Sequence, residues 1–290
     1  MRAKRYKLQR RLKQKRSRVK KLLKSRIFWF TIFGFFVLAG STYGIFFTPF
    51  FQIKHIEIRG NKNIAEEKLQ EAASKYLQRK VAFFATNNFF LANAAGVAAK
   101  IQTVFPEIES VAVQKKFPDK VRVTVQERQG IATWCQNKTL RVELEGSQEQ
   151  TTRSIRQCFT LDKQGVIFEE MESAKEVTLS AEGVEAALGD QVVDPVALER
   201  MLQFQRSVDA FPLFEQVGLR VLSLLVVSKE RVNAGISEGW EIYFNPSAGV
   251  DWQIQKVKLV LEQEISSQRR PFLEYIDLRF GDQAYIKYRQ

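Results

Sequence analysis

The sequence predicts an α+β protein, in which an N-terminal transmembrane helix precedes a small β-α-α-β-β domain and a mixed C-terminal β domain with flanking helices. Three observations lead to this prediction. Residues 27–53 contain no charged side chain. The next segment shows apolar patterns in the order strand, helix, helix, strand, strand, and residues 129–290 mix strand-like and helical stretches. The apolar content of 45% is enough for folded domains with cores of their own.

The first 26 residues form a strongly basic tail. They hold 14 of the 45 Lys and Arg residues and no Asp or Glu, so the formal charge of +13 lies in this tail. The rest of the chain carries 31 basic and 32 acidic residues and is close to neutral. A nucleic-acid-binding protein would place such charge on a folded face or a dedicated arm. Because this tail adjoins an apolar segment instead, we expect no nucleic-acid partner.

Residues 27–47 are predicted to cross the lipid bilayer. As a helix they would be about 31 Å long, the thickness of a bilayer's hydrocarbon core. Trp29 and Tyr43 lie near its ends, where amphipathic rings favour the headgroup region. The positive-inside rule then predicts a single-pass type II protein of the inner (plasma) membrane, with residues 1–26 cytoplasmic and the body outside the cytoplasm. A signal peptide cleaved at residues 37–39 is the alternative, but the apolar run exceeds the about 7 to 15 residues of a signal core.

The helical part of the small domain is marked by two patterns. Asn63 and Glu66 have the spacing of a capping box, which predicts a helix leading into residues 68–77. Apolar residues at helical spacing predict a second helix over residues 88–104. It should stop before Phe105-Pro106, since a residue that precedes proline prefers extended backbone.

Three stretches of the small domain predict strands. Residues 51–59 alternate apolar and polar side chains, as does the stretch 120–127. The third, residues 108–116, is joined to the last by the turn sequence Phe117-Pro118-Asp119. One sheet with both helices on one face is the simplest arrangement that buries these apolar faces.

Taken in order after a single anchor, these motifs resemble the POTRA domain of the FtsQ/DivIB family. The resemblance is carried by a capped helix and by the strings Ile56-Glu57-Ile58-Arg59-Gly60-Asn61, Phe105-Pro106-Glu107-Ile108, Phe117-Pro118-Asp119-Lys120-Val121 and Val125-Gln126-Glu127-Arg128. Each string is common by itself, and their order and spacing make the combination specific. The resemblance implies a POTRA domain over residues 51–128 and an FtsQ-type β domain over residues 129–290.

The β domain begins with a predicted hairpin. Residues 130–134 followed by residues 159–168 look like the family's first hairpin, formed around a glycine-containing turn. The polar residues 141–156 lie in the connection that precedes the second strand, and we expect them to form a flexible loop. The further predicted elements are a helix at 196–209, strands at 217–227 and 239–244, a helix at 252–266, and strands at 275–280 and 284–288.

Cys135 and Cys158 are the two cysteines of the chain. Both lie in strand-like runs that could become antiparallel neighbours, and an exported body permits a disulfide bond. Two buried free thiols are the alternative, so the sequence leaves the pairing open. Two cysteines and the single histidine, His55, cannot supply a zinc site, and we expect no metal and no other cofactor.

Residues 235–239 match the G-x-S-x-G pattern of hydrolase nucleophiles. In α/β-hydrolases the catalytic histidine follows the serine in the chain, whereas His55 lies far before Ser237. A glycine-rich turn is therefore the better interpretation. We expect a binding or scaffold protein rather than an enzyme, with no small-molecule substrate.

The resemblance implies a scaffold of the bacterial cell-division machinery, the divisome, at the division septum. Such a scaffold would bind FtsB-like and FtsL-like single-pass division proteins and support assembly of septal wall synthesis. A membrane-anchored transport or chaperone subunit with a POTRA domain is the alternative. An anchored wall enzyme is a third reading, which the missing catalytic groups argue against.

The final strand is the expected partner site. Residues 284–288 alternate and have no later element to pair with, so their outer edge could accept a partner strand. By resemblance, Arg279, Phe280 and Tyr288 match the family's partner-binding positions. The predicted partner-binding residues are therefore Arg279, Phe280, Tyr285, Ile286, Lys287 and Tyr288. In the alternative, Phe280 and Tyr288 are ordinary packing residues of an edge hairpin.

Overall fold

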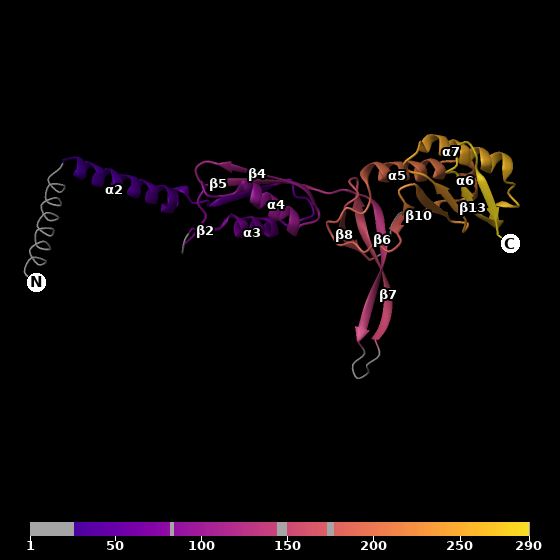
Figure 1. Cartoon of the computed structure of the whole chain (residues 1–290), viewed down its shortest axis with the longest axis horizontal. Coiled ribbons are helices and arrows are strands. Elements are labelled where there is room, and N and C mark those ends of the chain that lie inside the picture. Colours follow the sequence, from indigo (N-terminus) through magenta and orange to yellow (C-terminus); the bar gives the residue numbers. More distant parts are fainter. Residues whose placement is uncertain (1–25, 82–83, 144–149, 173–176, 290) are drawn as a thin grey trace, which may run out of the picture. The chain divides into compact units, whose positions relative to one another are not determined.

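The computed structural model describes residues 26–81, 84–143, 150–172 and 177–289 (Figure 1). Nearly all of the predicted basic tail therefore lies outside the described residues. The chain folds into two compact units. The first comprises Met1–Ile101 with Val111–Val125, and the second comprises Gln102–Ser110 with Gln126–Gln290. The predicted α+β class is confirmed, with an apolar N-terminal helix followed by mixed helices and sheets.

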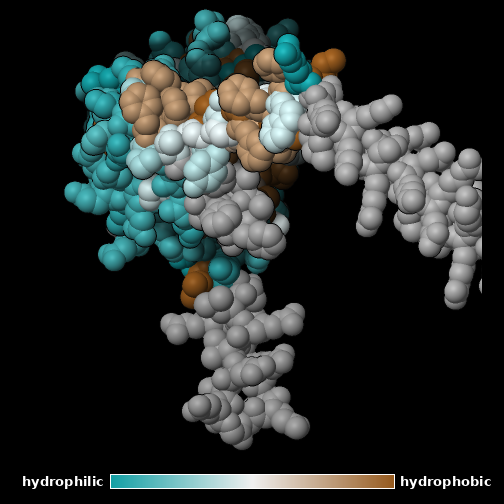
Figure 2. Space-filling view, turned by 90° about the vertical axis from the view of Figure 1, so that its left-hand side faces the viewer, coloured by the Kyte–Doolittle hydropathy of each residue, from teal (hydrophilic) through white to brown (hydrophobic). Residues whose placement is uncertain are grey.

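Helix α2 (Arg26–Phe47) covers the segment predicted to cross a membrane. Among the residues that the structure describes, it is the one helix long and apolar enough to do so. No part of its most apolar stretch, Trp29–Phe46, is buried inside the protein. Figure 2 looks at this end of the chain and shows apolar side chains gathered in front, whereas much of the remaining visible surface is hydrophilic.

The small domain is built on a three-stranded sheet of order β1-β5-β4. β1 (His55–Arg59) runs parallel to β5 (Lys120–Glu127), and the second neighbour of β5 is β4 (Ile108–Lys116). The bounds of β4 and β5 agree with the predicted strands. A 3₁₀ turn, η1 (Pro49–Phe51), precedes β1, so this strand begins later than the alternating pattern predicts.

Two helices complete the small domain, α3 (Glu66–Leu77) and α4 (Ala94–Val104). Their apolar faces enter the core through Leu69, Ala73, Leu77, Val97 and Ile101. A short hairpin, β2 (Arg79–Val81) and β3 (Phe84–Thr86), follows α3 and was not predicted.

Two predictions about these helices are wrong. The N-cap of α3 is Ala65, which has no side-chain oxygen, so Asn63 and Glu66 do not form a capping box. The second helix begins at Ala94 rather than residue 88, because Asn88 pairs with Gln52 in a β-bridge and cannot at the same time start a helix.

The second unit contains a nine-stranded sheet of order β14-β13-β12-β11-β10-β9-β6-β7-β8. β9 is parallel to both of its neighbours, and β12 is parallel to β13. The strands are β6 (Gly130–Glu143), β7 (Gln150–Asp162), β8 (Ile167–Met171), β9 (Thr178–Ala181), β10 (Val221–Ser228), β11 (Arg231–Ile236), β12 (Glu241–Phe244), β13 (Leu273–Asp277) and β14 (Tyr285–Tyr288).

Helices α5 (Pro195–Asp209), α6 (Pro212–Val217) and α7 (Val250–Leu259) lie together on one face of the C-terminal strands (Figure 1). Asp194 caps α5, since its side chain accepts hydrogen bonds from the first backbone amides of the helix. The layer between helices and sheet is strongly aromatic. The rings of Phe204 and Phe244 stack there with centroids 4.0 Å apart, and Trp134 and Trp240 are fully buried.

Several predicted boundaries in this unit are corrected. The predicted strand 217–227 starts at Val221, because α6 occupies the chain up to Val217 and Gly218 ends it with a left-handed conformation. The predicted helix 252–266 starts at Val250 and changes at Val260 into a π-helical turn that ends at Glu264. β9 and β11 were not predicted as separate strands.

The polar segment 141–156 is not the loop that the sequence predicts. β6 continues to Glu143 and β7 resumes at Gln150, with Glu143 opposite Gln150 in register. Residues 144–149 lie outside the described residues. Residues 150–156 are almost all polar, so they show no alternation of apolar and polar side chains. This explains why the first half of β7 was not predicted.

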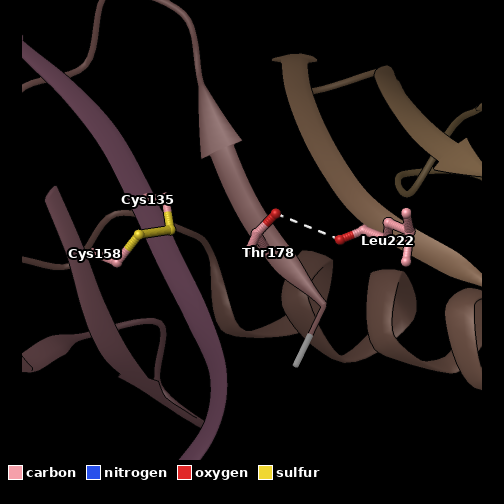
Figure 3. The surroundings of a disulfide bond; sticks show 4 residues. All are labelled: Cys135, Cys158, Thr178 and Leu222. Atoms are coloured by element: carbon pink, nitrogen blue, oxygen red, sulfur yellow. Dashed lines mark hydrogen bonds between the residues drawn. A yellow bond between two sulfur atoms is a disulfide. The ribbon is translucent and has the colours of Figure 1, made fainter. Parts of the chain in front are cut away.

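Cys135 and Cys158 lie directly opposite each other on β6 and β7 and form a disulfide bond (Figure 3). The alternative of two free thiols is therefore wrong. Both cysteines are buried, with 3% and 7% of their surface exposed. The bond joins residues 23 apart, and so it constrains the unfolded chain around the long hairpin.

Replacing both cysteines by alanine should destabilise the second unit by about 3 kcal/mol, the value that loop-closure entropy gives for a link of this length. Denaturant unfolding of the full chain in detergent, followed by the fluorescence of the buried tryptophans, measures the effect. Reductant should shift the wild-type curve and leave the cysteine-free variant unchanged. Equal midpoints for the oxidised and cysteine-free proteins would contradict a stabilising role.

Candidate functional site at the C-terminal sheet edge

β14 is the last strand at one edge of the nine-stranded sheet. It pairs antiparallel with β13, with Ile276 opposite Ile286 and Asp277 opposite Tyr285. In the described part of the chain, no strand lies on its other side. An edge strand directs half of its backbone N–H and C=O groups away from the sheet, where they can pair with another chain.

The opposite edge, β8, is partly covered. The amide of Ile167 donates to the carbonyl of Asp190 at 3.0 Å, and the amide of Gly189 donates to the carbonyl of Ile167 at 2.7 Å. Val166 and Gln191 form a β-bridge just before this strand. The segment after β9 thus pairs with the start of β8.

The two faces of β14 have different surroundings. Ile286 and Tyr288 point toward the helices and pack against the apolar core, and the guanidinium of Arg269 lies 4.2 Å from the Tyr288 ring centroid. Tyr285 and Lys287 point to the opposite face and are exposed. A strand added at this edge would therefore have apolar side chains beside it on the helix face of the sheet, and aromatic and basic side chains beside it on the opposite face.

Aromatic rings and cations extend across the face that the helices leave uncovered. The Lys287 ammonium lies 5.6 Å from the ring of Tyr275, which stacks on Tyr243 with centroids 4.7 Å apart. The guanidinium of Arg231 lies 4.3 Å from the Tyr243 ring. These four residues, here called the Tyr–cation ladder, come from β14, β13, β12 and β11. They fix the position of Lys287 beside the open edge.

The pKa values of two ladder residues are shifted. Burial, followed by the neighbouring Glu241 carboxylate, raises the pKa of Tyr243 to about 12. A hydrogen bond of 2.8 Å to Glu274 raises the pKa of Lys287. Both side chains therefore keep their protons at neutral pH, and the ladder retains its cations.

The turn between β13 and β14 carries the other predicted site residues. Arg279 forms two hydrogen bonds with the Asp277 carboxylate, at 2.9 and 2.6 Å, and this pairing raises the pKa of Arg279. Phe280 and Tyr285 form an edge-to-face pair with ring centroids 5.2 Å apart. Half of each is exposed, 52% and 51%. The turn thus presents an aromatic pair beside a held guanidinium.

A buried lysine of α7 holds this turn in place. The Lys256 ammonium donates to the carbonyls of Leu278 and Gly281 at 2.7 Å each, and to that of Gln283 at 3.1 Å. Only 5% of this residue is exposed, and burial lowers its pKa. Three backbone acceptors compensate the cost of burying the cation. Lys256 therefore fixes the backbone that carries Phe280 and leads into β14.

All six predicted residues lie in β14 or in the turn before it, but the structure divides them between two faces. Phe280, Tyr285 and Lys287 lie on the uncovered face, whereas Ile286 and Tyr288 are half-buried on the helix side. Sequence reasoning missed Lys256, Tyr243 and Tyr275. Strand alternation could have placed the two tyrosines opposite Ile242 and Ile276, but nothing in the sequence distinguishes Lys256 from an exposed helical lysine.

The G-x-S-x-G match forms the turn between β11 and β12. The Ser237 hydroxyl accepts a hydrogen bond from the amide of Arg220 at 3.1 Å, and Gly239 has a positive φ of 89°. The residue thus has a structural role in this turn. Among the described residues, no group of three or more His, Cys, Asp or Glu side chains could hold a metal ion.

Comparison with known proteins identifies the first of the two domains. The model of the FtsQ-type POTRA domain matches residues 51–128. The chain is also 31% identical over 120 residues to the cell division protein DivIB of Clostridium botulinum strain Hall, and equally to that of strain Loch Maree. Each alignment covers 41% of this chain and 40% of the relative, so the match spans less than half the length of these relatives.

The fold agrees with these matches. The three-stranded sheet and two helices described above occupy the region matched by the POTRA model, and they follow an apolar helix directly. The chain thus contains an FtsQ-type POTRA domain and is similar, over 120 residues, to cell division proteins DivIB.

Proposed function

We propose that this protein is a scaffold of the bacterial divisome, which binds other division proteins and supports assembly of septal wall synthesis. The FtsQ-type POTRA domain and the similarity to two proteins named cell division protein DivIB support this role. Catalysis forms no part of the proposal, because the site described above is a sheet edge with aromatic and basic side chains.

The open edge of β14 is the structural observation on which this proposal is based. A partner segment would add to the sheet as a tenth strand, with main-chain hydrogen bonds giving much of the affinity. Specificity would come from side chains on both faces, beside Ile286 and Tyr288 on the helix side and beside Phe280, Tyr285 and Lys287 on the other. Arg279, held by Asp277, could reach an acidic group of the partner at the turn.

We infer that the partners are FtsB-like and FtsL-like single-pass division proteins, as the family resemblance implies. Such proteins can present a short extended segment outside the membrane. The edge requires only such a segment, because β14 itself is four residues long.

The proposed topology places the body outside the cytoplasm of a single-pass inner-membrane protein. Residues 1–26 hold fourteen cations and no acidic residue, which favours a cytoplasmic N-terminus. The Cys135–Cys158 bond supports the same orientation, since disulfides persist in oxidising compartments and are rare in the cytosol.

A reporter fused after Gln290 tests this orientation. Alkaline phosphatase, which requires export, should be active there, whereas a fluorescent protein that matures only in the cytoplasm should be dark. As a control, both reporters are fused before Met1, where the activities should be reversed. If the C-terminal fluorescent protein is bright and the C-terminal phosphatase is inactive, the topology is wrong. Binding to partners outside the cytoplasm would then be excluded as well.

The aromatic pair at the turn tests the docking site. Phe280→Ala combined with Tyr285→Ala should weaken binding of an FtsB-like partner from the same organism by roughly thirtyfold or more, since central interface aromatics often contribute about 2 kcal/mol or more. These two exposed residues are better probes than Tyr288. Tyr288→Ala should weaken binding by a similar factor, but it also removes packing against the core.

Binding is measured by titrating the labelled partner onto the full chain in nanodiscs. Trp252→Ala is the matched control, because Trp252 is also an exposed aromatic residue of this unit but lies on α7. Its affinity should equal that of the wild type. If the double variant remains folded and binds as tightly as this control, the docking site lies elsewhere.

A further inference from the structure

Five phenylalanines gather at one end of the POTRA domain, and we call them the phenylalanine cluster. Phe51 is central: its ring centroid lies 4.9 Å from that of Phe50, 5.4 Å from Phe90 and 6.1 Å from Phe117. Phe89 contacts Phe117 at 5.8 Å and Phe90 at 5.6 Å. Three members are widely exposed, Phe50 by 60%, Phe90 by 49% and Phe117 by 64%. Large rings exposed together in this way indicate an interaction surface.

The chain itself places this cluster next to the membrane helix. α2 ends at Phe47, and Phe50 follows only three residues later. The loop that carries Phe89 and Phe90 is also tied to the helix end. The buried amide of Asn88 donates to the carbonyls of Ile45 at 2.8 Å and Phe46 at 3.2 Å.

These hydrogen bonds have a clear physical cause. The last carbonyls of a helix lack partners within the helix, and in a bilayer an unpaired carbonyl is costly. Asn88 supplies two of the missing donors, while its own Oδ1 accepts from the amide of Phe90 at 2.9 Å. The same residue thus completes the membrane helix and positions the exposed ring of Phe90 beside it.

Basic residues surround the cluster. Lys115 donates to the carbonyls of Phe89 and Ala92 and lies 5.3 Å from the Phe89 ring. Lys54, just before β1, and Lys116, just before Phe117, are both exposed. The acidic residue closest to Phe117 in the sequence is Asp119. Exposed rings flanked by lysines suit the boundary between acyl chains and anionic headgroups.

We propose that the phenylalanine cluster inserts into the outer surface of the same bilayer that α2 crosses, so that the POTRA domain rests on the membrane. Phe50, Phe90 and Phe117 would enter the headgroup and upper acyl region, while Lys54 and Lys116 would contact lipid phosphates. The bilayer is the favoured occupant because the cluster is continuous with the membrane helix. The domain is then oriented by two attachments, the covalent helix and the inserted rings.

Spin labels on the full chain in nanodiscs of phosphatidylethanolamine and phosphatidylglycerol test this proposal. Single cysteines are introduced by Phe117→Cys or Phe90→Cys, and Glu66→Cys serves as the control at the N-terminal end of α3. Collision with oxygen, which partitions into lipid, is compared with collision with a water-soluble nickel complex. Labels at 117 and 90 should favour oxygen, with a depth of about 5–10 Å below the phosphates. The label at 66 should favour nickel.

A second variant set removes the neighbouring rings. With the label at Phe117→Cys, replacing Phe50 and Phe90 by serine should abolish its preference for oxygen. Matched replacement of the exposed Val196, Leu222 and Trp252 by serine should leave that preference unchanged. Circular dichroism verifies that both sets fold.

The proposal is overturned if labels at 117 and 90 collide with nickel as readily as the label at 66. It is equally overturned if they are shielded from both reagents, or if dipolar broadening shows that a second copy of the chain covers the cluster.

Discussion

The continuous sheet of the β domain depends on main-chain pairing by one four-residue strand, β9. Thr178–Ala181 runs parallel to β6 on one side and to β10 on the other, and so joins the first hairpins to the C-terminal strands. Leu179 enters the core fully buried, and the Thr178 hydroxyl donates to the carbonyl of Leu222 (Figure 3). The buried side chain of Gln136 then forms two hydrogen bonds with the backbone of Ala186, which holds the chain after β9 against β6. Without these pairings, two smaller sheets would each have an additional open edge.

Sheet continuity determines which strand edges remain open for the proposed partner strand. With the start of β8 covered by residues 189–191, β14 is the open edge that lies beside the helix layer, whereas the other unpaired backbone lies along the long β6–β7 hairpin. The helices cover one face, and the Tyr–cation ladder occupies the other. Lys256 connects these features, because its ammonium reaches from α7 to the turn that precedes the edge strand. The β14 edge is therefore supported from the helix layer, from the sheet face and from the turn.

Much of this arrangement follows from local sequence signals. The strand patterns and the turn between them predicted β4 and β5 with their observed bounds, and the apolar run 27–47 predicted α2 to within one residue. The failures have identifiable causes. β9 is too short for its alternation to stand out. Asn88 lies outside the helix in which it was predicted, because its backbone forms a bridge with the distant Gln52 and its side chain bonds to carbonyls at the end of α2. The role of Lys256 also depends on residues more than 20 positions away, and no local pattern encodes it.

The central claim is that a partner adds a strand to β14, and amide hydrogen exchange on the full chain in nanodiscs tests it most directly. Exchange is followed residue by residue with and without a saturating FtsB-like protein from the same organism. Because successive amides of a strand alternate in direction, the account predicts that every second amide of residues 285–288 becomes protected, while β8 is unchanged. A partner that binds without slowing exchange in β14 would contradict the account.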